Sequence, residues 1–241
     1  MIYHHRARPT HPAENARLAA VSTVTAVRCR AVSATFASYR ADVVGAGELC
    51  RRAADFNARR GSPDWRAEEA ICAARSNVAN TTGAFADAAR LAERAAGLAR
   101  TGGDLADASV LLSAAAVRHV LAGDAPKAVP QASEALALAR RVGAQALIAT
   151  SLLASGLAAA GTDPGQAHAR LRESRELSAA IGYRNALDLG WATGITFLVG
   201  DAAAALELGR TAIHGIQWGG DRLADGHGPL LRCGRARHQP A

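Results

Sequence analysis

The stretch DLADASVLLSAAAVRHVLAGDAPKAVPQASEALALARRVG, residues 104–143, contains two helical patterns joined by a Gly123-Asp124 turn. In the second pattern, small and apolar residues recur at steps of four, three and three. These residues are Ala128, Ala132, Ala135 and Leu138. Such steps place side chains on one face of an α-helix, and an apolar face has to be buried against a neighbouring element. The stretch therefore predicts a helical hairpin closed by Gly143.

The same spacing occurs four more times along the chain. The first small residue of each copy follows the previous one by 42, 40, 39 and 37 residues; these residues are Ala46, Ala88, Ala128, Ala167 and Ala204. A glycine lies fifteen residues after each of them: Gly61, Gly103, Gly143, Gly182 and Gly219. Glycine makes up 23 of the 241 residues, so five matches at one offset are improbable by chance. The pattern indicates an array of repeats.

A further small residue lies twelve positions before each of these alanines, where it allows two helix backbones to approach closely. These residues are Ala34, Ser76, Ala116, Ser155 and Ala192. Aromatic residues are only 4% of the chain, which favours a core made of close helix contacts. We therefore predict an all-α fold, an α-solenoid of about five antiparallel helical hairpins over residues 16–225.

The two ends of the chain do not follow the repeat. Residues 1–15 carry three histidines and two prolines, and residues 226–241 have no 3.6-residue period. We expect both segments to be disordered. The Arg/Gly/Pro/His mixture of the last segment is also what out-of-frame translation of GC-rich DNA produces. A natural tail and a frame-slipped tail both stay open, with the second slightly favoured.

The charge pattern does not support nucleic-acid binding. The net charge is +7, and Lys127 is the single lysine among 28 basic residues. Residues 1–60 carry 10 basic and 4 acidic side chains, whereas residues 61–200 carry 13 of each. A neutral repeat region has no basic stripe that could follow a phosphate backbone. We expect no nucleic-acid binding by this chain alone.

We also expect a cytoplasmic protein that does not enter a membrane. Charged residues and glycines interrupt every apolar run before it reaches the roughly 18 residues of a membrane-spanning helix. Residues 1–15 lack the apolar run of a secretory signal. The cysteines form no Cys-x-x-Cys pair, so zinc-finger and thioredoxin-type chemistry is unsupported.

The sequence offers little for catalysis. A nucleotide-binding P-loop ends in Gly-Lys-Ser/Thr, but Lys127 is followed by alanine and valine. Single residues that invite a catalytic role, but lack a partner at a suitable spacing, are His119, His168, His214 and Asp188. Arg118 and His119 end a predicted helix, where we expect them to meet water or helix-end carbonyls. We expect no enzyme activity, no cofactor and no metal site.

The phrase AVPQASEAL, with small residues at its first and eighth positions, resembles the second helix of a tetratricopeptide repeat. The spacing of 37 to 42 residues exceeds the usual 34 of that family, and its aromatic and proline positions are largely missing. EALALARRVGA and FLVGDAAAALELGRTAI are similar to the longer, degenerate arrays at the C-terminal end of actinobacterial ATP-binding regulators of the LuxR type, some of them linked to a nucleotide cyclase. The resemblance covers residues 63–219.

The resemblance implies a non-enzymatic protein-binding module, the sensor or partner-binding part of a bacterial transcriptional or signalling regulator. The alternative is a truncated fragment of a multidomain ATP-binding or cyclase regulator that lacks the catalytic domain. The partner is expected to be a protein, a peptide or a second copy of this chain. In the tetratricopeptide phase its groove would be lined by small, apolar and weakly polar residues, without arginine or lysine. The predicted groove residues are Asn77, Asn80, Ser113, Val117, Val120, Leu152, Leu189, Thr193 and Thr196.

Overall fold

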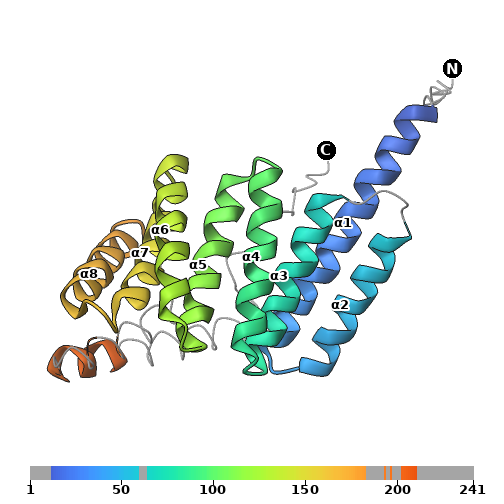
Figure 1. Ribbon diagram of the computed structural model, residues 1–241. Coiled ribbons are helices and arrows are strands. Elements are labelled where there is room, and N and C mark those ends of the chain that lie inside the picture. Colours follow the sequence, from blue (N-terminus) through green and yellow to red (C-terminus); the bar gives the residue numbers. More distant parts are fainter. Residues whose placement is uncertain (1–11, 60–63, 183–192, 194–195, 197–201, 211–241) are drawn as a thin grey trace, which may run out of the picture.

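The computed structural model describes residues 12–59, 64–182, 193, 196 and 202–210, and all regular structure in this part of the chain is helical. The helices are α1 (Pro12–Tyr39), α2 (Val43–Ala58), α3 (Trp65–Thr81), α4 (Phe85–Thr101), α5 (Leu105–Leu121), α6 (Ala125–Val142), α7 (Gln145–Ala159) and α8 (Pro164–Ala180). Residues 202–210 are helical as well. The hairpins stand side by side from α1–α2 to α7–α8 (Figure 1). The predicted all-α solenoid is confirmed.

The repeat glycines form the turns between hairpins. Gly103, Gly143 and Gly182 have φ angles of +82°, +78° and +68°, a region that side-chain-bearing residues rarely adopt. The Gly143 N–H donates to the Ala139 carbonyl at 2.9 Å and so closes α6. The other two repeat glycines, Gly61 and Gly219, lie outside the described residues. A left-handed turn at a fixed offset explains why glycine marks the repeat.

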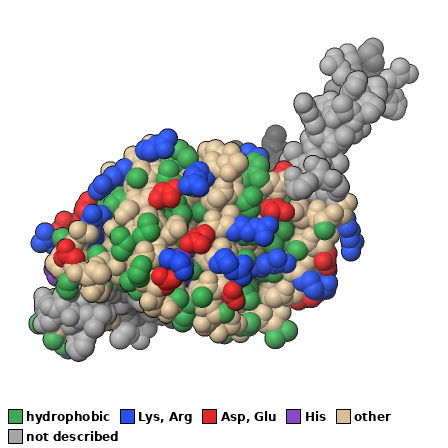
Figure 2. Space-filling model, in the orientation of Figure 1, with side chains coloured by type: hydrophobic (Ala, Val, Ile, Leu, Met, Phe, Trp, Pro, Cys, Tyr) green, Lys and Arg blue, Asp and Glu red, His purple; other side chains and the backbone are tan. Residues whose placement is uncertain are grey.

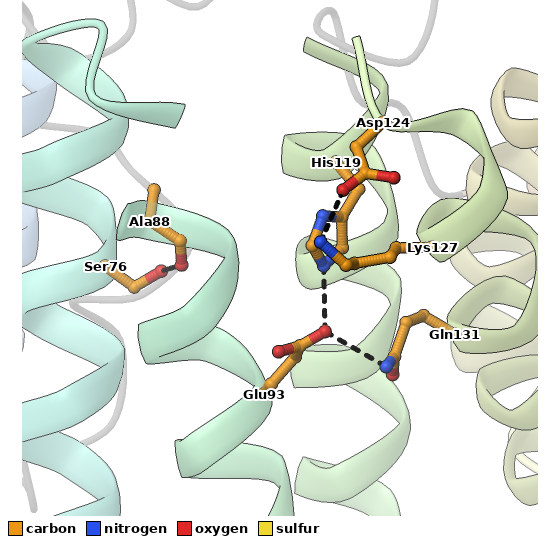
Figure 3. A network of polar contacts seen from close by, with 7 residues as sticks. All are labelled: Ser76, Ala88, Glu93, His119, Asp124, Lys127 and Gln131. Carbon is orange, nitrogen blue, oxygen red and sulfur yellow. Dashed lines mark hydrogen bonds and ion pairs between the residues drawn. The ribbon is translucent and has the colours of Figure 1, made fainter. Parts of the chain in front are cut away.

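The alanine stripe makes the closest helix contacts. Ala46, Ala88, Ala128 and Ala167 are fully buried, whereas Ala204 is half-buried. Serines support these contacts, because the Ser76 hydroxyl donates to the Ala88 carbonyl (Figure 3) and the Ser109 hydroxyl donates to the Ala135 carbonyl at 2.9 Å. Small side chains let the backbones come near enough for a hydroxyl to reach the next helix.

The odd-numbered helices form one layer of the array, but their spacing is uneven. α3 packs directly on α1, and α7 packs directly on α5. α3 and α5 make no comparable backbone contact. They meet through side chains such as Cys72 and Leu111, which share a core cluster with α4 and α6. The junction between α3 and α5 therefore has room for a long polar side chain to cross between the two helices.

Filling the close contact between α5 and α6 is expected to destabilise the protein. Ala135 is fully buried, and Ala137 lies exposed two residues further along the same helix. Ala135→Leu should lower the free energy of unfolding by about 1 to 3 kcal/mol because the added carbons force the helices apart. Ala137→Leu is the matched control and should change it by less than about 0.5 kcal/mol. Urea denaturation followed by circular dichroism measures both, and equal losses would contradict the packing.

The start of the first helix differs from the sequence-based boundary. α1 begins at Pro12, four residues before the expected start at residue 16, because proline is compatible with a first helical turn. Residues 1–11, residues 226–241 and most of the fifth predicted hairpin lie outside the described residues, so the predictions for them stay predictions. None of the described helices has the length and hydropathy to cross a membrane.

Candidate protein-binding face

A series of hydrogen-bonded polar side chains connects α1, α3 and α5, the first three helices of the odd-numbered layer. The Arg118 guanidinium donates to the Asn77 side-chain oxygen at 2.5 Å, and the Asn77 amide donates to the Thr35 hydroxyl at 3.2 Å. Thr35, Asn77 and Arg118 come from α1, α3 and α5, and they are 42 and 41 residues apart. They therefore occupy nearly equivalent positions of successive repeats. Their side of the three helices is called the α1–α3–α5 face below.

Arg118 is buried at this crossing. Burial lowers the pKa of its guanidinium, while the nearby Tyr39 acts in the opposite direction. An arginine remains charged at neutral pH even after such a shift. The expectation that Arg118 meets water or helix-end carbonyls was wrong, because α3 and α5 leave room for its side chain to reach Asn77. The face therefore includes the cationic side chain of Arg118, whereas the predicted groove contained no arginine or lysine.

A second polar row crosses the same three helices nearer the beginning of α3 and α5. It consists of Arg28 on α1, Glu69 on α3, and Asp107 with the N-cap residue Asp104 on α5. Glu69 is only 8% exposed, but its carboxylate oxygens are not among the fully buried, unpaired side-chain atoms of the described residues. Its pKa is raised to about 7, first by burial and then by the charges of Asp107 and Asp104, while Arg28 acts in the opposite direction.

The other two acids of this row, Asp104 and Asp107, are less buried than Glu69. The Asp104 carboxylate accepts the backbone N–H of Asp107 at 3.0 Å, which caps α5. Asp107 is half-buried, and burial followed by the charge of Asp104 raises its pKa. Asp104 is thus the acid of the row whose carboxylate accepts a backbone hydrogen bond.

Val32 and Val110 lie one helical turn from the charged row, and Tyr39 lies one turn from Thr35. Val32 and Tyr39 on α1 are exposed, and so is Val110 on α5. Val110 follows Ala108 by two positions, which turns it about 200° away from the side of α5 that packs on α4 and α6. The α1–α3–α5 face therefore combines exposed apolar side chains with two charged residues, Arg118 and Glu69, that are each only 8% exposed.

The predicted groove residues fall into three groups. Asn77 is hydrogen-bonded to Thr35 and Arg118, and Asn80 is half-buried on the same helix. Ser113 and Leu152 are buried where α5 packs on α7, and the Ser113 hydroxyl lies 3.0 Å from the Ser151 hydroxyl. Burial in this contact leaves these two side chains no surface for a partner.

Of the remaining predicted residues, two lie in the last part of α5 and three lie after α8. Val117 and Val120 are half-buried and pack against the cluster around Leu153 and Leu157. Thr193 is half-buried and Thr196 is buried, whereas Leu189 lies outside the described residues. The prediction missed Glu69, Asp107 and Arg118. The spacing of Thr35, Asn77 and Arg118 was the signal that could have identified Arg118.

His119 belongs to a different network, between α4, α5 and α6 (Figure 3). Its Nε2 lies 2.8 Å from Glu93 Oε1, and the Gln131 amide donates to the same oxygen at 3.1 Å. His119 is buried and its ring pairs with Glu93, so the expectation that it meets water or helix-end carbonyls was also wrong. Its partners on α4 and α6 hold the three helices together. Among the described residues, no group of three or more His, Cys, Asp and Glu could hold a metal ion.

A cleft of about 310 Å³ lies at the first hairpin. It is lined by Arg30, Arg51, Arg52, Asp55, Phe56 and Arg59. Arg51 is already paired with Glu48 at 2.7 Å and with Asp55 at 2.8 Å. On the face drawn in Figure 2, basic and acidic side chains are interspersed over the described residues.

The fold places this chain among helical-repeat solenoids of the tetratricopeptide-like kind. Neither a family model nor a curated protein matches its sequence. The solved structure of BtubC (BKLC) from P. vanneervenii is similar to it, with a TM-score of 0.63 and 16% identity, and the match covers 93% of this chain and 92% of that one.

A second similar structure is a signal transduction ATPase with numerous domains, which has a tetratricopeptide-repeat sensor and comes from Pyrococcus horikoshii. The TM-score is 0.56 with 13% identity, and the match covers 85% of this chain but only 38% of the ATPase chain. At these identities both similarities establish the fold alone.

Proposed function

We propose that this chain is a non-enzymatic helical-repeat module that binds a protein or peptide on the α1–α3–α5 face. The observation that carries the proposal is the set of exposed apolar side chains beside the hydrogen-bonded residues Thr35, Asn77 and Arg118 on one face of three helices. Solenoids use the surface formed by successive first helices to hold extended or helical segments. Val32, Tyr39 and Val110 supply apolar contacts there.

The proposed setting is the sensor or partner-binding part of a bacterial signalling or transcriptional regulator. The similarity to an ATPase with a tetratricopeptide-repeat sensor supports this setting. Because the match covers 38% of that chain, it also favours the alternative that this sequence is a fragment of a larger ATP-binding or cyclase regulator. We propose no catalytic role for the chain in either setting.

A pair of matched variants tests the binding face. Val110 on α5 is 41% exposed, and Val129 on the neighbouring layer, in α6, is 42% exposed. Peptides selected from a random display library against the whole chain would be measured by fluorescence anisotropy. Val110→Asp should weaken their binding by about tenfold or more, because a charge placed in an apolar contact costs at least ~1.4 kcal/mol.

Val129→Asp is the control and should leave affinity within about twofold. Light scattering of the same samples would show whether two copies of the chain associate through this face in place of binding a peptide. Loss of binding in Val129→Asp, or none in Val110→Asp, would contradict the proposal.

A further inference from the structure

The cleft at the first hairpin has an excess of positive charge. Of the six side chains that line it, four are arginines and one is an acid: Arg30, Arg51, Arg52, Arg59 and Asp55. Four cations and one anion give a net charge of +3. The Asp55 carboxylate already pairs with Arg51 at 2.8 Å, and Arg51 also pairs with Glu48 at 2.7 Å. Among the described residues, neither Arg52 nor Arg59 forms an ion pair, so both can pair with a ligand.

The cleft lies in the part of the chain that carries the excess charge. Residues 1–60 have 10 basic and 4 acidic side chains, whereas residues 61–200 have 13 of each. A cleft lined by charges of one sign strengthens the local electric field and attracts groups of the opposite sign. The expected ligand of this cleft is therefore anionic.

The two unpaired arginines are separated along α2. Arg52 and Arg59, the residue that caps the end of α2, are seven positions apart. This spacing places them on the same side of the helix and about 10 Å apart along its axis. Phe56 lies between them on that side and is half-buried. The Arg30 guanidinium comes from α1 and lies 4.9 Å from the centre of the Phe56 ring, and it donates to the Ala26 carbonyl at 3.0 Å.

This arrangement indicates the chemical class of the ligand. Guanidinium groups bind carboxylates and phosphates through charge-assisted hydrogen bonds. A ligand with two anionic groups about 10 Å apart can pair with Arg52 and Arg59 at once, whereas a single phosphate group can do so only by drawing both side chains together. An extended peptide advances about 3.3 Å per residue, so acidic residues three positions apart have the matching separation.

We propose that this cleft binds an acidic segment of a partner protein. Its carboxylates would pair with Arg52 and Arg59, and an apolar residue between them would contact Phe56. Arg30 precedes Val32 by two positions, which turns the cleft about 200° around α1 from the exposed apolar side chains of the α1–α3–α5 face. The cleft is therefore a second interaction surface, and it does not depend on the proposed function of that face.

The test uses two peptides of nearly the same shape. The first is N-acetyl-Asp-Glu-Leu-Glu-Asp-amide, and the second has asparagine and glutamine in place of the four acids. Calorimetry with the whole chain at pH 7 and low salt should give about tenfold tighter binding of the acidic peptide. Because both partners are exposed charges, about 0.5 M salt should remove most of this preference.

A pair of matched double variants locates the binding. Arg52→Gln with Arg59→Gln should weaken binding of the acidic peptide by about fivefold to tenfold, because two exposed ion pairs are lost. Arg140→Gln with Arg141→Gln removes the same charge from the exposed last turn of α6 and should weaken binding by less than about twofold. Circular dichroism of both variants checks that the helices are retained.

Three results would overturn the inference. They are equal binding of the two peptides by the unmodified chain, equal losses in the two double variants, and displacement of the acidic peptide by inorganic phosphate beyond the effect of chloride at the same ionic strength. The last result would identify a site for a single phosphate group. The peptide comparison uses the unmodified chain, so it decides the inference even if a double variant does not fold. The Val110 and Val129 comparison concerns the other surface, so either proposal can fail without the other.

Discussion

Replacing Leu152 with alanine should lower the free energy of unfolding by about 2 to 5 kcal/mol. Leu152 is 0% exposed in α7, the helix that packs directly on α5. Truncation removes its buried carbons and leaves a cavity that neighbouring helices fill only in part. Urea denaturation followed by circular dichroism at 222 nm gives the change.

Leu206, in the helical segment 202–210, is 58% exposed and provides the control. Leu206→Ala should change the free energy of unfolding by less than about 1 kcal/mol. A similar small loss in Leu152→Ala would contradict the burial of Leu152. It would instead support the sequence-based prediction that Leu152 lines the binding groove.

The second large effect concerns the pH dependence that Glu69 imposes on stability. Its pKa is about 7 in the folded protein and 4.5 for the ordinary side chain. Between these values the folded chain holds more protons than the unfolded chain, so stability falls as pH rises from 4.5 to 7. Above pH 7 the full cost of about 3 kcal/mol is present.

Glu69→Gln removes this cost, because a neutral amide replaces the buried charge. The variant should be more stable than the unmodified chain by up to about 3 kcal/mol at pH 8, with little difference at pH 4.5. Chemical denaturation at the two pH values, with Glu173→Gln as the exposed control, measures the effect. If unmodified chain and Glu69→Gln showed the same pH dependence, Glu69 would have to be solvated or paired.

The fold was predictable because the repeat uses glycines and small side chains at positions where few other residues fit. A left-handed turn favours glycine, so Gly103, Gly143 and Gly182 could be aligned from the sequence. A close helix contact requires a small side chain, so Ala88 and Ala128 were also informative. Helical periodicity then gave the buried side of each second helix.

The binding face was harder to predict, because periodicity fixes which residues share a helix side but not how neighbouring first helices are spaced. Ser113 and Leu152 have suitable offsets, yet α5 and α7 pack so closely that both are buried. α3 and α5 do not pack in this way, so Arg118 reaches Asn77 there.

Hydrogen exchange of the whole chain, with and without a selected peptide, tests the central claim most directly. Binding on the α1–α3–α5 face should slow the exchange of backbone amides in α1, α3 and α5, because the bound segment stabilises these helices against local opening. Amides of α6, on the other layer, should exchange at unchanged rates. Protection confined to α6 and α8, with α1, α3 and α5 unaffected, would contradict the account.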